Sequence, residues 1–379
     1  MNRACRRNIT GGRHSALQKG CRNLNTIDEI RETASKTGVF LPIIHACDAL
    51  SEAAELHGVS LPNRAVLQIT GGFDADENGA PSGETIERYV DAVRKRRYSI
   101  VFFEPAAITA DARSQEQQFI LSERTQSAFA KLCNAVREAS VEAHGDSPLL
   151  VALLDHAGHR ALSPSAAECS PNYPSEAALL TDEDLTRLVI ACGEAAKAAE
   201  SAGFNGAALN VSGRNLFGES LAAFHRDGKF GGDFDDRSRF VRDCYTAMKM
   251  TTESIFFSIR LCLCDGLPQP DGWGMSMDSN APDIYEPSLL LNILRTLYGV
   301  ELVSCEIGIP GINWLTEAEA ESELIRLSRL CTCVAMVDSN LQQNVQLILP
   351  ELADQEIPFE NLAAGMISGE FASFAGYLG

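Results

Sequence analysis

Short apolar runs alternate with amphipathic helical patterns along most of the chain, and this alternation limits the fold more than any other feature. Eight runs have the length and composition of buried strands: 65–69, 100–103, 149–154, 207–210, 255–260, 302–307, 333–337 and 362–366. Seven helical patterns separate them: 84–97, 114–144, 181–202, 239–250, 287–297, 317–330 and 340–352. Strands that alternate with helices pair in parallel. Eight repeats in 379 residues therefore predict a single-domain α/β fold, the (β/α)8 TIM barrel.

The ends of this pattern and its two longest interruptions set the predicted domain limits. Residues 1–27 contain six Lys and Arg residues and no acid. A basic, acid-free start can be a transit peptide, but this one lacks a clear apolar face, so we expect a disordered leader or a start site placed too far upstream. We assign 28–379 to the barrel. The long segments 155–180 and 263–285 follow strands, on the side of a barrel where substrate loops lie.

The chain is acidic, with a formal net charge of −19. This charge disfavours nucleic acids and anionic membranes as partners. No apolar run reaches the roughly 18 residues that a membrane-spanning helix needs. The twelve cysteines include no C-x-x-C pair, a usage typical of reduced, mostly buried thiols. We therefore predict a cytoplasmic protein that acts on a small-molecule substrate.

Polar residues that follow predicted strands are the first candidates for a functional site, because the carboxyl ends of parallel strands face the ligand crevice. Asn210 ends the fourth predicted strand, and Gly213 and Asn215 follow it. Arg260 ends the fifth strand, which is otherwise almost entirely apolar. A buried unpaired charge is costly. Arg260 therefore either contacts an anionic ligand or an electron-rich ring edge, or pairs with an acid such as Glu104 or Glu306.

A second group of candidates follows the third strand. Asp155, His156 and His159 combine one acid with two imidazoles, which could bind a divalent metal or could be hydrogen-bonded loop residues. Carboxylates that could act as a general acid or base also follow other strands: Asp74, Asp76, Glu104, Glu306 and Asp338. Spacing alone does not single out one of them.

Four longer motifs carry a resemblance to a known family. They are Leu61-Pro-Asn-Arg64, the segment from Gly79 to Arg88-Tyr89, Phe230-Gly-Gly232 with Arg237-Ser-Arg239-Phe240, and Arg260 to Asp265 followed by Gly272-Trp-Gly274. Together they resemble the old yellow enzyme family of NADH:flavin oxidoreductases, of the 2,4-dienoyl-CoA reductase type. The similarity extends from about residue 61 to residue 371, which is nearly the whole predicted barrel.

This resemblance implies a flavoprotein that binds FMN, takes hydride from NAD(P)H and reduces an activated C=C bond. Arg260 occupies the position of the arginine that contacts the pyrimidine edge of the flavin, where it favours the negative charge of the reduced ring. The other cofactor-binding positions implied are Thr70, Gly71, Pro105, Ser339 and Ser368. The catalytic positions, which hold the substrate, correspond to Asn210 and Asn215.

Several positions depart from the family pattern. Leu153 replaces a flavin-binding Gln, and Ser368 replaces the Arg that clamps the phosphate. No Lys or Arg follows Arg329, so FMN binding is predicted to be weak. Asn210, Gly213 and Asn215 replace the usual substrate-binding pair and proton-donating Tyr. The family's C-terminal iron–sulfur segment and NAD domain have no counterpart, which implies direct transfer from nicotinamide to flavin.

Two alternatives remain open from the sequence. The first is a non-catalytic barrel that has lost flavin and acts as a binding protein, because several polar groups of the family site are missing. The second is a flavin-free enzyme that uses Asp155, His156 and Glu306.

Overall fold

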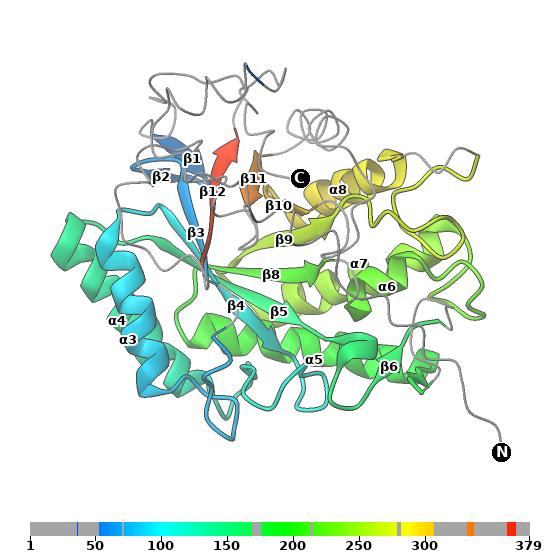
Figure 1. Ribbon diagram of the computed structural model, residues 1–379, viewed down its shortest axis with the longest axis horizontal. Helices are drawn as coiled ribbons and strands as arrows, with labels where there is room; N and C mark the ends of the chain where they lie inside the picture. Colours follow the sequence, from blue (N-terminus) through cyan, green and yellow to red (C-terminus); the bar gives the residue numbers. More distant parts are fainter. Residues whose placement is uncertain are drawn as a thin grey trace.

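A closed barrel of eight strands forms the centre of the protein (Figure 1). The structure, a computed structural model, describes residues 36, 53–69, 72–168, 176–212, 215–278, 282–306, 332–336 and 362–368. The barrel strands are β3 (Ala65–Ile69), β4 (Ile100–Ala107), β5 (Leu149–Asp155), β8 (Gly206–Val211), β9 (Phe256–Cys262), β10 (Leu302–Glu306), β11 (Thr332–Met336) and β12 (Leu362–Ser368). Each coincides closely with one of the eight predicted strands, which confirms the α/β fold and its curled, mainly parallel sheet.

The last strand differs from the prediction in its direction. Seven strands, β3 to β11 in the order of the barrel, pair in parallel, whereas β12 is antiparallel to both β11 and β3. The prediction that all eight strands are parallel was therefore wrong for β12. An apolar run carries no information on direction, and the parallel orientation rested only on the helical pattern 340–352, which lies outside the described residues.

Helices cover the outer face of the sheet (Figure 1). They are α3 (Gly83–Lys95), α4 (Gln126–His144), α5 (Asp182–Ser201), α7 (Phe234–Thr251) and α8 (Tyr285–Tyr298), with the short α6 (Leu216–Leu221) after β8. Capping boxes at Ser82 and Thr181 fix the first turns of α3 and α5. The predicted helix 114–144 begins only at Gln126, because 111–125 form turns. In the described part of the chain, no helix is long and apolar enough to cross a membrane.

Apolar side chains fill two separate layers. A large outer core lies between the sheet and the helices, and includes Phe103, Leu209 and Ile259. A smaller inner core fills the barrel with Val66, Ile100, Phe102, Val151, Leu153, Ala208 and Leu302. Leu56 and Leu61 also join the inner core. They come from the hairpin β1 (Ala54–Leu56) and β2 (Val59–Leu61), which the sequence pattern did not predict and which lies just before the amino end of β3.

Three small elements complete the described fold. The 3-10 turn η2 (Gly158–Arg160) follows β5, and the two-residue strands β6 (Ser165–Ala166) and β7 (Ala178–Leu179) pair with each other beyond it. All three lie in or near the predicted loop 155–180, on the carboxyl side of β5. The loop therefore contains ordered structure beside the site.

Candidate functional site at the carboxyl ends of the strands

The inner face of the barrel changes from apolar to polar toward the carboxyl ends of its strands. Because side chains alternate along a strand, the residues two positions beyond inner-core members also face inward. Gln68 follows Val66, Asp155 follows Leu153, Asn210 follows Ala208 and Ser304 follows Leu302. All four are at least nine-tenths buried. Buried polar side chains need hydrogen-bond partners, so a group of them on the inner face of a barrel points to a ligand or to ordered water.

The carboxylate of Asp155 accepts hydrogen bonds from both of the predicted catalytic residues. Its Oδ1 accepts hydrogen bonds from Asn210 Nδ2 and Asn215 Nδ2, each at 3.0 Å. Its Oδ2 accepts from Gln118 Nε2 at 3.2 Å. Asp155 is 6% exposed and Asn215 is fully buried. The sequence prediction that Asn210 and Asn215 lie in one site after the fourth strand therefore agrees with where the structure places them.

Asn215 also shapes the start of α6. Its side-chain oxygen accepts from the Gly218 N–H at 3.0 Å, which makes Asn215 the N-cap of this helix. The same side chain donates to the backbone oxygen of Asn210. One amide thus links the end of β8, the carboxylate of Asp155 at the end of β5 and the first turn of α6.

The two histidines after β5 lie near Asp155 but have separate partners. The Gly158 N–H donates to His156 Nδ1 at 3.1 Å, so the proton of the neutral ring is on Nε2. Burial lowers the pKa of His156, which keeps the ring neutral, although Asp155 opposes the shift. His159 instead pairs through Nδ1 with Glu219 of α6, whose side chain is fully buried.

The metal hypothesis for Asp155, His156 and His159 finds no support in the described residues. No group of three or more His, Cys, Asp or Glu side chains in the described ranges is arranged to hold a metal ion. The reason is local: amides occupy Asp155, and Glu219 holds His159. For the flavin-free hypothesis, His156 Nδ1 already accepts a hydrogen bond from the Gly158 N–H. The side chain of Glu306, the third residue of that hypothesis, lies outside the described part of the structure, so the hypothesis stays a prediction.

Arg260 lies on the inner face of β9 beside the polar group. It pairs in register with Asn210 on one side and with Ser304 on the other. Residues that pair in register project from the same face of a sheet, so Arg260, Asn210 and Ser304 form one row across β8, β9 and β10. The predicted placement of Arg260 at the mouth of the barrel agrees with this register.

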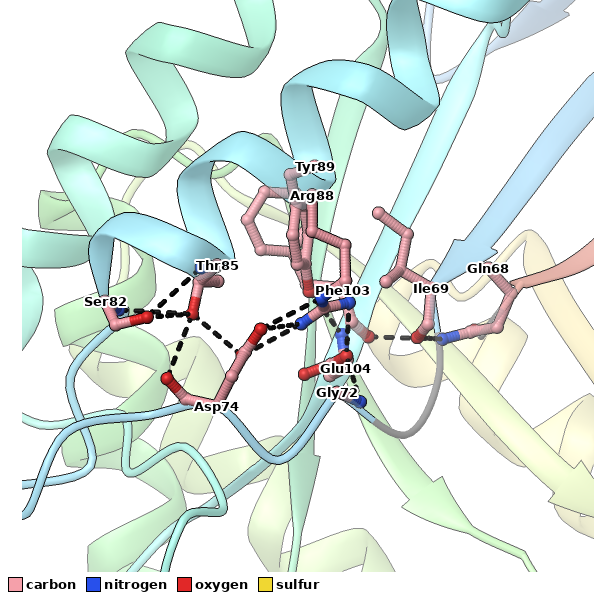
Figure 2. A network of polar contacts seen from close by, with 10 residues as sticks. All are labelled: Gln68, Ile69, Gly72, Asp74, Ser82, Thr85, Arg88, Tyr89, Phe103 and Glu104. Carbon is pink, nitrogen blue, oxygen red and sulfur yellow. Dashed lines mark hydrogen bonds and ion pairs between the residues drawn. The ribbon is translucent and has the colours of Figure 1, made fainter. Parts of the chain in front are cut away.

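Glu104, one of the acids considered as a partner of Arg260, pairs with a different arginine. Arg88 of α3 makes a two-pronged hydrogen bond to Asp74, with Nε–Oδ2 and Nη2–Oδ1 both at 2.9 Å. Its Nη1 lies 2.7 Å from Glu104 Oε1. Figure 2 shows the guanidinium of Arg88 between the two carboxylates. The Glu104 side chain is 7% exposed, and burial raises its pKa against the attraction of Arg88.

This cluster, Asp74–Arg88–Glu104, anchors the loop after β3. The Gly72 N–H donates to Glu104 Oε1 at 2.7 Å (Figure 2). A Cβ on Gly72 would lie 1.9 Å from Arg88 Nη2, so the backbone approaches the ion pair as closely as glycine allows. The Glu104 N–H donates to Tyr89 Oη at 3.0 Å. Gly72, which follows the predicted flavin contacts Thr70 and Gly71 in the sequence, is therefore held in place by the cluster.

The remaining predicted positions have different outcomes. Pro105 pairs in register with the inner-core residue Leu153, which places it beside the barrel interior. Ser368 ends the reversed strand β12 and pairs with Cys333 near the start of β11. It therefore lies toward the amino ends of the neighbouring strands, away from the predicted phosphate position. Other predicted positions lie outside the described residues: Thr70, Gly71, Gly213 and Ser339.

Four polar residues of this region were missed by sequence reasoning: Gln68, Arg88, Gln118 and Glu219. Gln68 had a usable signal, because it is the only polar residue in the run Ala65–Ile69. Its Nε2 donates to the Ile69 and Phe103 carbonyls at 3.0 and 3.2 Å (Figure 2). The other three lie on helices or loops, where polar residues are ordinary, and only the fold brings them to the site.

Three buried atoms of the inner row, as we call the inward-facing residues Gln68, Asn210, Arg260 and Ser304, have no hydrogen-bond partner in the described structure. They are Gln68 Oε1, Asn210 Oδ1 and Ser304 Oγ. An unsatisfied buried polar atom costs about 1–3 kcal/mol. Three such atoms on one inner surface are therefore the signature of a site that a ligand or water completes.

Comparison with solved structures gives the fold of the chain a context. It is similar to 2-naphthoyl-CoA reductase (TM-score 0.63, 15% identity), covering 76% of this chain but only 46% of that one. It is also similar to the old yellow enzyme homologue from Zymomonas mobilis (TM-score 0.56, 17% identity, 69% and 74% of the two chains). The similarity to morphinone reductase has a TM-score of 0.59 at 17% identity and covers 75% of this chain and 78% of that one.

Comparisons of the sequence alone find no related protein. No protein-family model matches the chain, and no curated protein matches it. At 15–17% identity, structural likeness reports the fold rather than the activity. The chain thus shares a barrel fold with these three reductases.

Proposed function

We propose that this protein is an FMN-dependent oxidoreductase that accepts hydride from NAD(P)H and reduces an activated C=C bond. The eight-stranded barrel would be its catalytic domain. The observation that carries the proposal is the inner row of Gln68, Asn210, Arg260 and Ser304. Its support from outside the chain is the shared fold.

The residues present fit the polar edge of a flavin. The pyrimidine part of the ring offers both N–H donors and carbonyl acceptors. Gln68 Oε1 and Asn210 Oδ1 are buried acceptors without partners in the described structure, and the hydroxyl of Ser304 can donate or accept. Arg260 adds a positive charge in the same row. When bound, the flavin would supply the two-electron chemistry that no amino-acid side chain provides.

The protein's own contributions follow from the positions of these groups. Arg260 favours a negatively charged ring by direct electrostatics. The Asp74–Arg88–Glu104 cluster holds the loop after β3 through Gly72. Asp155 fixes the amides of Asn210 and Asn215, so that their orientation is set before a ligand arrives. Such preorganisation limits the free energy lost in ordering the site on binding.

Binding of the phosphate is the weak point of the proposed site. A Lys or Arg is absent after Arg329, and the register of β12 turns Ser368 toward the opposite end of its neighbours. Backbone N–H groups bind a dianion less strongly than a two-pronged guanidinium. FMN is therefore expected to bind weakly and to be lost during purification.

A direct experiment tests the proposed activity. The full-length protein is mixed anaerobically with FMN and then with NADH or NADPH, and the blue absorbance of oxidised flavin is followed. Bleaching faster than with free FMN, followed by recovery on addition of an activated alkene such as maleimide, is the expected result. If bleaching is no faster than for free FMN with either nucleotide, the oxidoreductase proposal is wrong.

A second candidate is a barrel that has lost flavin and serves as a binding protein. Leu153 favours it, because this fully buried inner-core residue presents no hydrogen-bonding group where the resemblance expects Gln. The two candidates separate on FMN binding: the binding-protein hypothesis predicts none, and the oxidoreductase hypothesis predicts weak but saturable binding.

A further inference from the structure

Asp155 dictates which way two neighbouring amides face. An ionised carboxylate only accepts hydrogen bonds, so any amide in contact with it must present its NH2 group. Asn210 and Asn215 both do so, at 3.0 Å from Oδ1. The orientation of Asn215 is fixed a second time, because its oxygen accepts from the Gly218 N–H. The orientation of both side-chain amides, and so the position of each side-chain oxygen, therefore follows from the hydrogen bonds to Asp155.

The side-chain oxygen of Asn210 consequently accepts no hydrogen bond in the described structure. The side chain lies on the inner face of β8 and is 6% exposed, and Oδ1 has no partner in the described structure. Gln68 shows the same arrangement on the inner face of β3. Its NH2 group donates to the Ile69 and Phe103 carbonyls, and its Oε1 is buried without a partner. Two strands thus turn amide oxygens, not amide NH2 groups, toward the interior.

We infer that Asp155 is a positioning residue that sets ligand specificity: it makes Asn210 present an acceptor, so the site takes a ligand group that donates a hydrogen bond. Amide or imide N–H, amine and hydroxyl groups belong to this class, whereas a bare ketone, ester or nitro oxygen does not. A ketone oxygen would face the Asn210 oxygen and leave both acceptors unpaired. Within the proposed function, on which this inference rests for its reaction, the donor is an N–H group, either that of the flavin or that of an unsaturated amide or imide substrate.

Two matched compounds test the inference by binding alone. Benzamide and acetophenone have similar size and both contain a carbonyl, but only benzamide carries N–H donors. Their dissociation constants are measured by calorimetry on the full-length protein without FMN. Wild type is expected to prefer benzamide by about tenfold or more, the factor that corresponds to one buried acceptor left unpaired.

Two variants and one control locate the preference. Asn210→Leu keeps the approximate shape and removes the acceptor, while Asp155 retains Asn215 and Gln118 as donors; the preference should fall to about onefold. Asp155→Asn frees the Asn210 amide to turn, and should reduce the preference while the protein remains folded. Asp91→Asn, an exposed residue of α3, makes the same change of charge and should leave the preference intact.

The outcomes separate this inference from the proposed activity. A preference in wild type that Asn210→Leu removes supports the inference even if no hydride transfer occurs. If saturation with FMN abolishes the preference, the donor is the N–H of the flavin; if it persists, the donor belongs to the substrate. Equal binding of both compounds, tighter binding of acetophenone, binding of neither, or a preference retained in Asn210→Leu would each overturn it.

Discussion

Removal of Arg88 should expose how much the anchor of the β3 loop contributes to stability. Arg88→Met retains an apolar side chain of similar length but leaves Asp74 and Glu104 as two partly buried carboxylates without their shared cation. Breaking a buried ion pair by deleting one partner costs about 3–5 kcal/mol. The Arg88 side chain is 21% exposed, so solvent screening reduces the expected loss to about 2–4 kcal/mol.

The same helix supplies a matched control. Arg94 of α3 pairs with Glu142 at 3.1 Å, but their side chains are 51% and 73% exposed. Exposed pairs contribute about 0–1 kcal/mol. Arg94→Met should therefore lower the free energy of unfolding by less than about 1 kcal/mol. Urea unfolding followed by tryptophan fluorescence at pH 7 compares the two variants.

The loss should also depend on pH, with a sign that follows from Glu104. Burial raises the pKa of Glu104 in the folded protein above its unfolded value of about 4.3. The folded state then binds more protons between these two values, so stability falls as pH rises through that interval. Without Arg88 the interval widens, so the penalty of Arg88→Met is largest at pH 7 and shrinks toward about pH 4–5. Equal losses for Arg88→Met and Arg94→Met, or a loss that grows on acidification, would refute the role assigned to the cluster.

Three further substitutions test separate parts of the site. Leu153→Gln places a hydrogen-bonding group on the inner face of β5 and should tighten FMN binding by about tenfold, measured by flavin fluorescence; unchanged affinity would show that the ring does not reach β5. Ser368→Arg should leave FMN affinity unchanged, because β12 is reversed, and a recovery of affinity in the same titration would argue for a parallel strand. Gly158→Ala should destabilise the fold by about 1–3 kcal/mol in urea unfolding, since Gly158 has φ 61° and a Cβ would lie 2.7 Å from Glu219 Oε1; a neutral effect would mean that the turn after β5 is loosely packed.

The strands were predictable because a barrel strand that is buried on both faces is apolar throughout, and such runs are visible in a sequence. The direction of β12 was not predictable, since an almost entirely apolar strand such as Leu362–Ser368 has the same pattern whether it runs parallel or antiparallel to its neighbours. Asn210, Asn215 and Arg260 were candidates because polar residues at the carboxyl ends of apolar runs face the crevice, and the structure places Asn210 and Arg260 in register and Asn215 beside Asp155. The pairing of Glu104 with Arg88 was not predicted, because Arg88 lies on a helix face where basic residues are common. The hydrogen bonds to Asp155 could not be predicted from the sequence, because their donors come from three separate segments: β8, the start of α6 and the loop before α4.

Titration of the purified full-length protein with FMN, in wild type and Arg260→Ala, tests the central claim most directly. Quenching of flavin fluorescence reports binding without any requirement for turnover. The account predicts saturable one-to-one binding in the micromolar range for wild type, weakened by about tenfold or more in Arg260→Ala, as expected for the loss of a hydrogen bond to a charged group. The absence of saturable binding in wild type, or equal affinity in the two proteins, would contradict the assignment of the inner row of Gln68, Asn210, Arg260 and Ser304 to a flavin.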